Sequence, residues 1–314
     1  MERPLVVSAS PHLHSGASIR GIMLDVLIAL VPAAVASVLL FGWRAAAVTI
    51  VCIAASVAAE YVCRIIMKRP QTVGDLSAVV TGALLAFNLP STLPLWQAAF
   101  GSVVAIVVAK QMFGGLGYNF VNPALAGRIV LMFSFPDTMN TWVPPLKAAA
   151  DAVSTATPLT QLQQGQPITL SLGELFLGIR AGSLGETCAL ALLIGGVYLV
   201  IRRVISPLIP LTFIGTVFVL TWILGQPPLV HILSGGLLIG AIFMATDYVT
   251  SPLSKAGKVM FAVGCGLLTV LFRLYGSLPE GVSYAIILMN ILVPLIERVT
   301  QPLPFGSKRR LRRE

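Results

Sequence analysis

A group of hydroxyl side chains lies in the sequence DAVSTATPL of residues 151–159. Ser154 and Thr157 stand three positions apart, Asp151 precedes them, and Pro158 follows directly. In most proteins a Ser/Thr group before a proline forms a turn through hydroxyl–backbone hydrogen bonds or caps a helix. A reactive hydroxyl is the other interpretation, and residue types alone do not decide between the two.

Two asparagines offer a second place for chemistry. Asn119 and Asn122 lie three residues apart, on one face if the segment is helical, directly after a break that contains Gly114, Gly115 and Gly117. A side-chain amide both donates and accepts hydrogen bonds, so the pair could bind the polar edge of a ligand. The alternative is that the pair caps a broken helix.

The composition places these groups in a membrane protein whose surroundings are lipid. Of 314 residues, 56% are hydrophobic and only 11% are charged, whereas soluble domains carry about 25% charged residues. The net charge of +9 comes from basic residues scattered between apolar runs, which indicates membrane topology and not nucleic-acid binding. The four cysteines lack a CxxC spacing, so neither a metal site nor a disulfide within the chain is expected.

We predict an all-α, polytopic membrane protein with about ten transmembrane helices. A helix needs about 20 apolar residues to cross about 30 Å of hydrocarbon. Candidate segments are 22–41, 45–67, 74–90, 94–112, 123–135, 186–201, 207–225, 229–246, 257–273 and 282–298. The third and fifth are short and bounded by Gly or Pro, so broken or partly re-entrant helices are expected there.

The positions of Lys and Arg predict that both termini are cytoplasmic, because cytoplasmic loops retain these residues. With ten spans, all but four of the 21 Lys and Arg fall on the cytoplasmic side; the exceptions are Arg44, Lys147, Arg180 and Arg273. The predicted organisation is a cytoplasmic segment 1–21, a five-helix membrane repeat 22–135, an extracytoplasmic loop 136–185, a second five-helix repeat 186–298 and a basic cytoplasmic tail 299–314. A short interfacial helix is expected over 170–179 of the loop.

A weak internal repeat accompanies this division. The sequence TGALL of residues 81–85 recurs as SGGLL at 234–238, five spans later. Because five is odd, the halves would enter the membrane from opposite sides and form an inverted repeat, an arrangement that places a functional site near the midplane, where helices break. A chance match is the alternative, since such sequences are common in membrane helices.

Acidic residues at membrane depth are costly and usually functional. Asp25, Glu60 and Asp247 are the candidates for an ion pathway. The alternative is ordinary ion pairing, of Asp25 or Glu60 with Arg20 or Arg64, and of Asp247 with lysines 255 and 258. No residue is expected to act as a catalytic group.

Several motifs resemble one family of redox-driven membrane proteins. The sequence around Thr157 is similar to the flavinylation motif shared by the B subunit of sodium-pumping NADH:quinone oxidoreductase and the D subunit of the Rnf complex. The sequences SPHLHS at 10–15, IMLDVL at 22–27, GYNFVNP at 117–123 and ATDY at 245–248 also resemble this family. The resemblance therefore covers nearly the whole chain.

The resemblance implies two flavins. FMN would be joined covalently through its phosphate to Thr157, whose hydroxyl can accept a phosphoester. Ser154 belongs to the motif, the small Ala156 would admit a flavin transferase and the flavin, and Asp151 would help that transferase hold its metal and substrate. Asn119 and Asn122 would contact a second, non-covalent flavin, riboflavin.

The resemblance also implies a function. The chain would be a subunit, inactive alone, of an ion-translocating complex in a bacterial or archaeal inner membrane, coupling ferredoxin:NAD electron transfer to Na⁺ or H⁺ movement. Electrons would arrive from an FMN-carrying subunit on the outer side and move inward. The lack of a long N-terminal extension favours the Rnf D subunit over the quinone-reductase B subunit. The alternative from another class is a secondary transporter without a redox cofactor.

Overall fold

The computed structural model describes residues 18–145, 157–166, 170–276 and 281–300, and these residues form helices and turns without a β-strand. The all-α prediction is therefore confirmed for the described part of the chain. The elements are α1 (Ile19–Phe41), α2 (Trp43–Ile66), η1 (Val73–Asp75), α3 (Ser77–Phe87), α4 (Leu95–Ile106), η2 (Val107–Gln111), α5 (Pro123–Ser134), α6 (Pro136–Met139), α7 (Pro158–Gln163), α8 (Leu172–Leu177), α9 (Ala189–Ile201), α10 (Leu208–Ile223), α11 (Pro228–Leu233), α12 (Leu237–Ile239), η4 (Gly240–Met244), α13 (Lys255–Tyr275) and α14 (Val282–Thr300).

Each of the ten predicted segments contains helix. Four helices, α1, α2, α13 and α14, are long and apolar enough to cross a membrane, and five shorter apolar helices accompany them. The chain is thus a multi-pass membrane protein, while ten crossings stays a prediction. The short helix expected in the long loop is confirmed as α8, where Ser171 and Glu174 form a capping box.

Two of the predicted segments hold only half-length helices. α3 has 11 residues and α5 has 12, which corresponds to about 16–18 Å at about 1.5 Å per residue. Neither matches the thickness of the hydrocarbon by itself. The expectation of short helices at these two places is confirmed.

The prediction of one continuous helix over 229–246 is wrong. α11 ends at Leu233, Ser234 is extended, and Gly235 and Gly236 have φ of 69° and 68°. A right-handed helix cannot pass through two left-handed residues, and glycine is the residue that adopts this conformation without steric strain. The helix resumes as α12 and continues as the π-helix η4.

The two halves of the chain repeat the same order of packing. In the first half α2 packs against α4 and α4 against α5; in the second half α10 packs against α13 and α13 against α14. The leading helices α1 and α9 pack against each other. However, TGALL lies inside α3, whereas SGGLL crosses the break between α11 and α12, so this sequence match does not join equivalent positions. The inverted repeat stays a prediction, supported by the order of packing.

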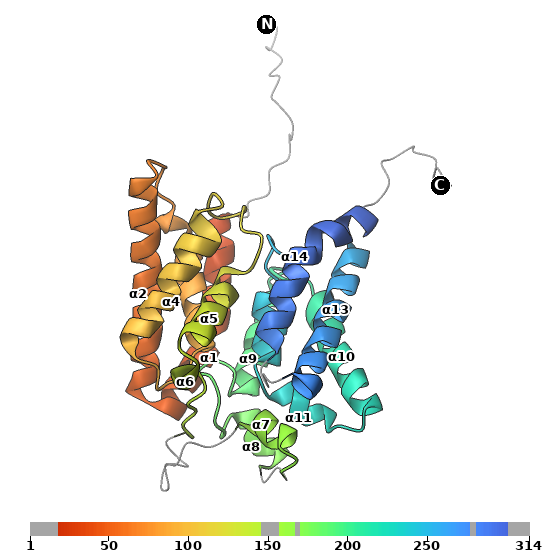
Figure 1. Cartoon of the computed structure of the whole chain (residues 1–314). Coiled ribbons are helices and arrows are strands. Elements are labelled where there is room, and N and C mark those ends of the chain that lie inside the picture. The colour runs from red at the N-terminus through yellow and green to blue at the C-terminus, as the bar shows by residue number, and fades with distance from the viewer. Residues whose placement is uncertain (1–17, 146–156, 167–169, 277–280, 301–314) are drawn as a thin grey trace, which may run out of the picture.

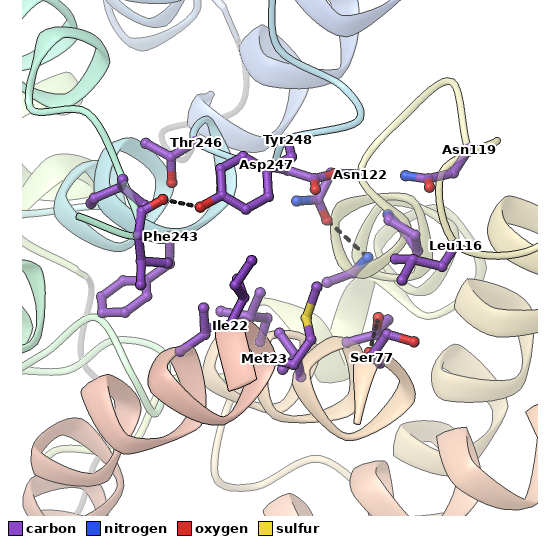
Figure 2. A pocket seen from close by; sticks show the side chains of 18 of the residues that line it. Ile22, Met23, Ser77, Leu116, Asn119, Asn122, Phe243, Thr246, Asp247 and Tyr248 are labelled. Atoms are coloured by element: carbon purple, nitrogen blue, oxygen red, sulfur yellow. Dashed lines mark hydrogen bonds between the residues drawn. The ribbon is translucent and has the colours of Figure 1, made fainter. Parts of the chain in front are cut away.

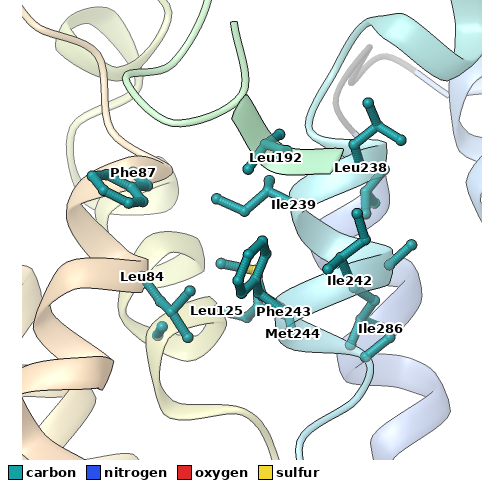
Figure 3. Close-up of a cluster of buried hydrophobic side chains, with 14 of the residues drawn as sticks. Leu84, Phe87, Leu125, Leu192, Leu238, Ile239, Ile242, Phe243, Met244 and Ile286 are labelled. Atoms are coloured by element: carbon teal, nitrogen blue, oxygen red, sulfur yellow. The ribbon is translucent and has the colours of Figure 1, made fainter. Parts of the chain in front are cut away.

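A buried apolar core joins the halves (Figure 3). Leu84 and Phe87 of α3 and Leu125 of α5 lie opposite residues of α9, α12, η4 and α14. Ile239 and Phe243 belong to the same cluster. The core therefore occupies the middle of the bundle, between its two ends.

The bundle has two distinct ends (Figure 1). α1 begins and α14 ends at one of them, which we call the terminal face, and α7 and α8 lie at the other, which we call the loop face. At the terminal face the Ser254 Oγ donates a hydrogen bond of 2.9 Å to Thr300 Oγ1. This arrangement agrees with the prediction that the 136–185 loop and the two termini lie on opposite sides, and the compartments themselves stay a prediction.

Candidate functional site

A pocket opens among the helix ends near the terminal face (Figure 2). Its cavity volume is about 100 Å³, and it is partly open to the outside. Its walls are mostly apolar, with contributions from α1, α3, α9 and η4. A few polar side chains interrupt them, among them Ser77, Lys110, Asn119, Asn122 and Asp247.

The two predicted asparagines both line this pocket, but not on one helical face. The segment before α5 is not helical, because Gly114, Gly115 and Gly117 have positive φ. Asn122 is the N-cap of α5: its Oδ1 accepts from the backbone N–H groups of residues 124 and 125 at 3.0 and 3.3 Å. Asn119 is 5% exposed and donates from Nδ2 to the Val121 carbonyl at 3.1 Å. The capping interpretation is therefore confirmed for Asn122.

Asp247 reaches the same pocket from the other half of the chain. It follows η4, and Thr250 Oγ1 donates to its Oδ2 at 3.1 Å. The neighbouring Tyr248 donates its hydroxyl to the Val204 carbonyl, which fixes the loop against the end of α9. The structure thus brings Asp247 to Asn119 and Asn122, although more than 120 residues separate the aspartate from the two asparagines in sequence.

Glu60 lies beside the pocket in a buried ion pair. Its Oε2 is 2.7 Å from Lys110 Nζ, and the two side chains are 0% and 2% exposed. The alternative interpretation from the sequence was an ordinary ion pair with Arg20 or Arg64, whereas the ion-pair partner in the structure is Lys110. Lys110 was not predicted as a site residue, although a lone lysine inside the apolar segment 94–112 is the signal that could have found it.

Asp25 forms a separate contact outside the pocket. Tyr198 donates its hydroxyl to Asp25 Oδ1 at 2.9 Å, and Arg202 Nε lies 3.3 Å from the same oxygen. The sequence offered Arg20 or Arg64 as the partner of Asp25 in an ordinary ion pair, and the partner in the structure is Arg202. The Arg202 side chain is 58% exposed, so this contact joins α1 to α9 at the terminal face.

Thr157 lies at the loop face as the N-cap of α7. Its Oγ1 accepts from the Thr160 N–H at 3.3 Å and lies 2.9 Å from Thr160 Oγ1. Pro158 occupies the first helical position, which it favours because it has no N–H to satisfy. The cap interpretation is confirmed, and Thr157 is buried, with 4% of its surface exposed. Asp151, Ser154 and Ala156 lie outside the described residues.

The α7 helix docks on the break between α11 and α12. Leu159 lies against Gly235, where a Cβ atom would clash with the leucine side chain. Gln163 Nε2 donates to the Arg273 carbonyl at 2.8 Å. The Arg273 guanidinium donates to carbonyls of the break, with Ser234 at 2.9 Å and Gly235 at 3.0 Å. Thr157 therefore starts a helix that rests on the second half of the chain.

Polar groups also link the middle of the bundle to the pocket. Arg128 Nη1 donates to Asn88 Oδ1 at 2.7 Å, and Asn88 Nδ2 lies 3.6 Å from Met244 Sδ. Asn122 Nδ2 donates to the Met244 carbonyl at 3.3 Å. Arg128 is 3% exposed and lies inside α5, so it carries no topological information, although the charge count included it among the cytoplasmic residues.

The residues of the pocket fit a flavin ring. An isoalloxazine ring needs apolar walls for its faces and hydrogen-bonding groups at its edge. Both are present, since apolar side chains line most of the pocket and two buried amides face it together with a lysine. No group of three or more potential metal-ligating His, Cys, Asp and Glu side chains occurs in the described part of the chain.

Fold and sites together define a helical, multi-pass membrane protein with a mostly apolar, partly open pocket at one end and a helix-capping threonine at the other. The chain belongs to the NQR2, RnfD, RnfE family, whose sequence profile matches residues 6–306.

Relatives with established names are similar along their whole length. The D subunit of the Na⁺-translocating ferredoxin:NAD⁺ oxidoreductase complex of Acetobacterium woodii is 48% identical over 97% of this chain and 96% of the relative. The D subunit of the proton-translocating ferredoxin:NAD⁺ oxidoreductase complex of Clostridium ljungdahlii is 44% identical over 96% of both chains. The D subunit of the ion-translocating oxidoreductase complex of Stutzerimonas stutzeri is 40% identical over 93% of this chain and 94% of the relative.

Proposed function

We propose that this chain is the D subunit of an Rnf-type, ion-translocating ferredoxin:NAD⁺ oxidoreductase complex in the bacterial or archaeal inner membrane. Within the complex it passes electrons across the membrane between FMN attached to Thr157 and a second, non-covalent flavin in the pocket. Its partners are the other subunits, including an FMN-carrying subunit on the outer side, and a flavin transferase that matures it. The names of relatives that are 40–48% identical support this assignment.

The observation that carries the proposal is the placement of the two sites. Thr157 lies at the loop face, whereas the pocket with Asn119 and Asn122 lies near the terminal face. The apolar core lies between them. A protein that moves electrons across a membrane needs a redox group toward each side, and these two places supply one each.

A bound flavin would supply the electron-transfer chemistry; the chain supplies position and surroundings. Asn119 and Asn122 would hold the polar edge of the ring, while apolar residues such as Ile22, Val26 and Leu199 would exclude water from its faces. Lys110 would place a positive charge at the wall. Glu60 fixes that lysine through the 2.7 Å ion pair.

Electron movement between the two sites is electrogenic. Moving one elementary charge across the membrane corresponds to about 2.3 kcal/mol per 100 mV of membrane potential. This energy is comparable with a modest drop in redox potential, so electron flow can be coupled to cation movement. Relatives of nearly equal similarity are named as Na⁺-translocating and proton-translocating, so similarity alone does not select the ion.

Attachment of FMN requires the N-terminus of α7 to open. The Thr157 hydroxyl is buried and engaged with Thr160, and a transferase must reach it. Loss of one helix cap costs about 1 kcal/mol, so opening the first turn of a six-residue helix is energetically accessible. The modification then replaces the proton of the Thr157 hydroxyl, whose oxygen lies 2.9 Å from Thr160 Oγ1.

Thr157→Ala tests the attachment. We expect the wild-type subunit, co-expressed with a flavin transferase, to fluoresce under ultraviolet light on a denaturing gel and to carry the mass of one FMN phosphoester. Thr157→Ala should lose both signals because no hydroxyl remains. Ser171→Ala is the matched control, since it removes the cap of α8 but leaves the attachment residue. Fluorescence that survives in Thr157→Ala would contradict the proposal.

Two alternatives predict different outcomes. The B subunit of sodium-pumping NADH:quinone oxidoreductase would carry the same covalent flavin but would copurify with quinone-reducing activity. A secondary transporter would carry no flavin at all. The three relatives described above are named as subunits of oxidoreductase complexes, which favours a redox subunit over a transporter.

A further inference from the structure

We propose that Lys110, Ser77 and Asp75 form a proton relay between the pocket and the terminal face. The inference rests on the proposed second flavin. It adds a role for Lys110 beyond the positive charge at the pocket wall, and it gives roles to Ser77 and Asp75. A flavin ring that accepts two electrons also takes up protons at its nitrogen atoms. A buried site therefore needs a route for those protons.

The three side chains are joined by short hydrogen bonds. Lys110 Nζ donates to Ser77 Oγ at 2.6 Å, and Ser77 Oγ donates to Asp75 Oδ1 at 2.5 Å. Lys110 and Ser77 both line the pocket. Asp75 is partly exposed and belongs to η1, the turn that precedes α3. The chain of hydrogen bonds thus runs from the pocket wall to the surface.

Local backbone geometry holds the outer end in place. The Ser77 N–H also donates to Asp75 Oδ1, at 2.8 Å. Leu76, between them, has φ of 66°, a left-handed conformation that is strained for a leucine. This turn brings the carboxylate back over the start of α3, within reach of both groups of Ser77.

Other charged groups lie near Lys110. Glu60 of α2 is 2.7 Å from Nζ, and Thr72 Oγ1 donates to the other oxygen of Glu60 at 2.6 Å. Asp247 lies within electrostatic reach from the second half of the chain. Arg64 of α2 lies near Gly115, beside Gln111. The buried ion pair by itself is weak evidence for stability, because replacing such a pair by apolar residues of similar size often leaves the folding stability unchanged.

When the ring receives two electrons from another flavin of the complex, one N–H bond at Lys110 breaks and one N–H bond forms on the ring. A carboxylic proton of Asp75, taken from the medium, moves to Ser77 Oγ as the serine proton moves to Lys110 Nζ, which restores the ammonium group. On oxidation of the ring the proton moves outward, from Lys110 through Ser77 to Asp75. This is the direction in which the two hydrogen bonds are donated in the structure.

The test uses the full-length chain with Thr157→Ala, so that its remaining flavin is the non-covalent one. The protein is reduced with dithionite in a stopped-flow instrument, in H₂O and in D₂O, while flavin absorbance and the colour of a pH indicator are followed. Flavin content is measured separately by acid extraction. Ser77→Ala removes the middle oxygen of the relay and leaves the Lys110–Glu60 pair. Ser102→Ala is the control, because Ser102 is also buried and donates to the Ala98 carbonyl of α4, outside the relay and the pocket.

We expect Ser77→Ala to retain its flavin and to slow the proton uptake that accompanies reduction by about tenfold or more, since positioned proton transfer typically contributes about 10²–10⁴-fold. The solvent isotope effect on reduction should rise. Asp75→Asn should show the same defect, partly restored by added acetate as a diffusible acid. Ser102→Ala should match the parent.

Two results would overturn the relay. One is unchanged proton uptake in Ser77→Ala at full flavin content. The other is loss of flavin from Ser77→Ala, which would make the serine a structural part of the pocket. A parent protein that releases no flavin on acid treatment would instead contradict the second flavin itself, and this outcome is recognised before any relay variant is measured.

Discussion

Single residues in this protein combine a structural contact with a proposed role. Asn122 caps α5 through Oδ1 and donates to the Met244 carbonyl through Nδ2, while the same side chain faces the pocket. Thr157 likewise caps α7 and is the proposed point of flavin attachment. A helix cap and a binding role are therefore not exclusive, because a cap residue places its polar side chain at a helix end, where cavities open.

The two asparagines can be tested separately because only one of them is a cap. Asn119→Leu removes the amide, and Asn122→Asp keeps the capping oxygen but removes the Nδ2 donor. Each lost hydrogen bond is worth about 1 kcal/mol, so each variant should retain non-covalent flavin several-fold less tightly, and replacing both residues by leucine should release most of it. Acid extraction measures the remaining flavin.

Asn140→Leu is the control for these variants, since Asn140 is exposed and follows α6 at the loop face. Covalent FMN on Thr157 should be unaffected in all of them. Normal non-covalent flavin in the double leucine variant would show that Asn119 and Asn122 are structural only and that the second site lies elsewhere.

At the scale of elements, broken helices determine where the sites lie. α3 and α5 are half-length, and the predicted span 229–246 is divided at Gly235 and Gly236. The break between α11 and α12 exposes backbone carbonyls inside the bundle, and buried arginines contact them: Arg273 donates to those of Ser234 and Gly235. The α7 helix rests on this same break, so the break positions Thr157.

Gly235→Ala should therefore disturb both the break and the flavin attachment site. The new Cβ would clash with Leu159, and alanine is strained at a φ of 69° by about 1–2 kcal/mol. We expect a lower melting temperature in detergent, faster proteolysis near α7 and altered attachment of FMN to Thr157.

Gly225→Ala is the matched control for this effect. Gly225 has the same φ of 69°, but nothing lies within 4 Å of its Cβ position. It should show the backbone strain alone, with α7 and FMN attachment unchanged. Equal behaviour of the two variants would mean that α7 does not depend on its contact with Gly235.

At the scale of the whole molecule, the two ends of the bundle are separated by an apolar core. α1 begins and α14 ends at the terminal face, and α7 and α8 lie at the loop face. In the proposed function, electrons pass between the two faces across this core. Within the part of the chain that the structure describes, polar side chains enter this core. Arg128 donates to Asn88, and Asn88 in turn contacts Met244.

The proposed topology predicts opposite compartments for the two faces. A reporter fused after Gly165 should be active on the outside, and one fused after Glu314 should be active in the cytoplasm. The physical reason is the retention of Lys and Arg in cytoplasmic loops. Reporters that indicate the same compartment would contradict both the orientation and the odd number of crossings predicted for the second half.

Much of this protein could be predicted from the sequence because hydrophobicity determines which segments enter lipid. All ten apolar segments contain helix, the short helices at 74–90 and 123–135 were expected, and the family follows from motifs spread over the chain. These features depend on local composition and on short patterns. Neither requires knowledge of which helices become neighbours.

Only the tertiary structure decided which side chains contact one another. Glu60 pairs with Lys110, and Asp25 with Arg202, because helix packing, and not distance in sequence, places charges next to one another. Packing also brings Asp247 to the asparagines of the first half. The Thr157 hydroxyl is buried for the same reason: α7 folds onto the break at Gly235, a contact between segments about 75 residues apart, which local sequence patterns cannot encode.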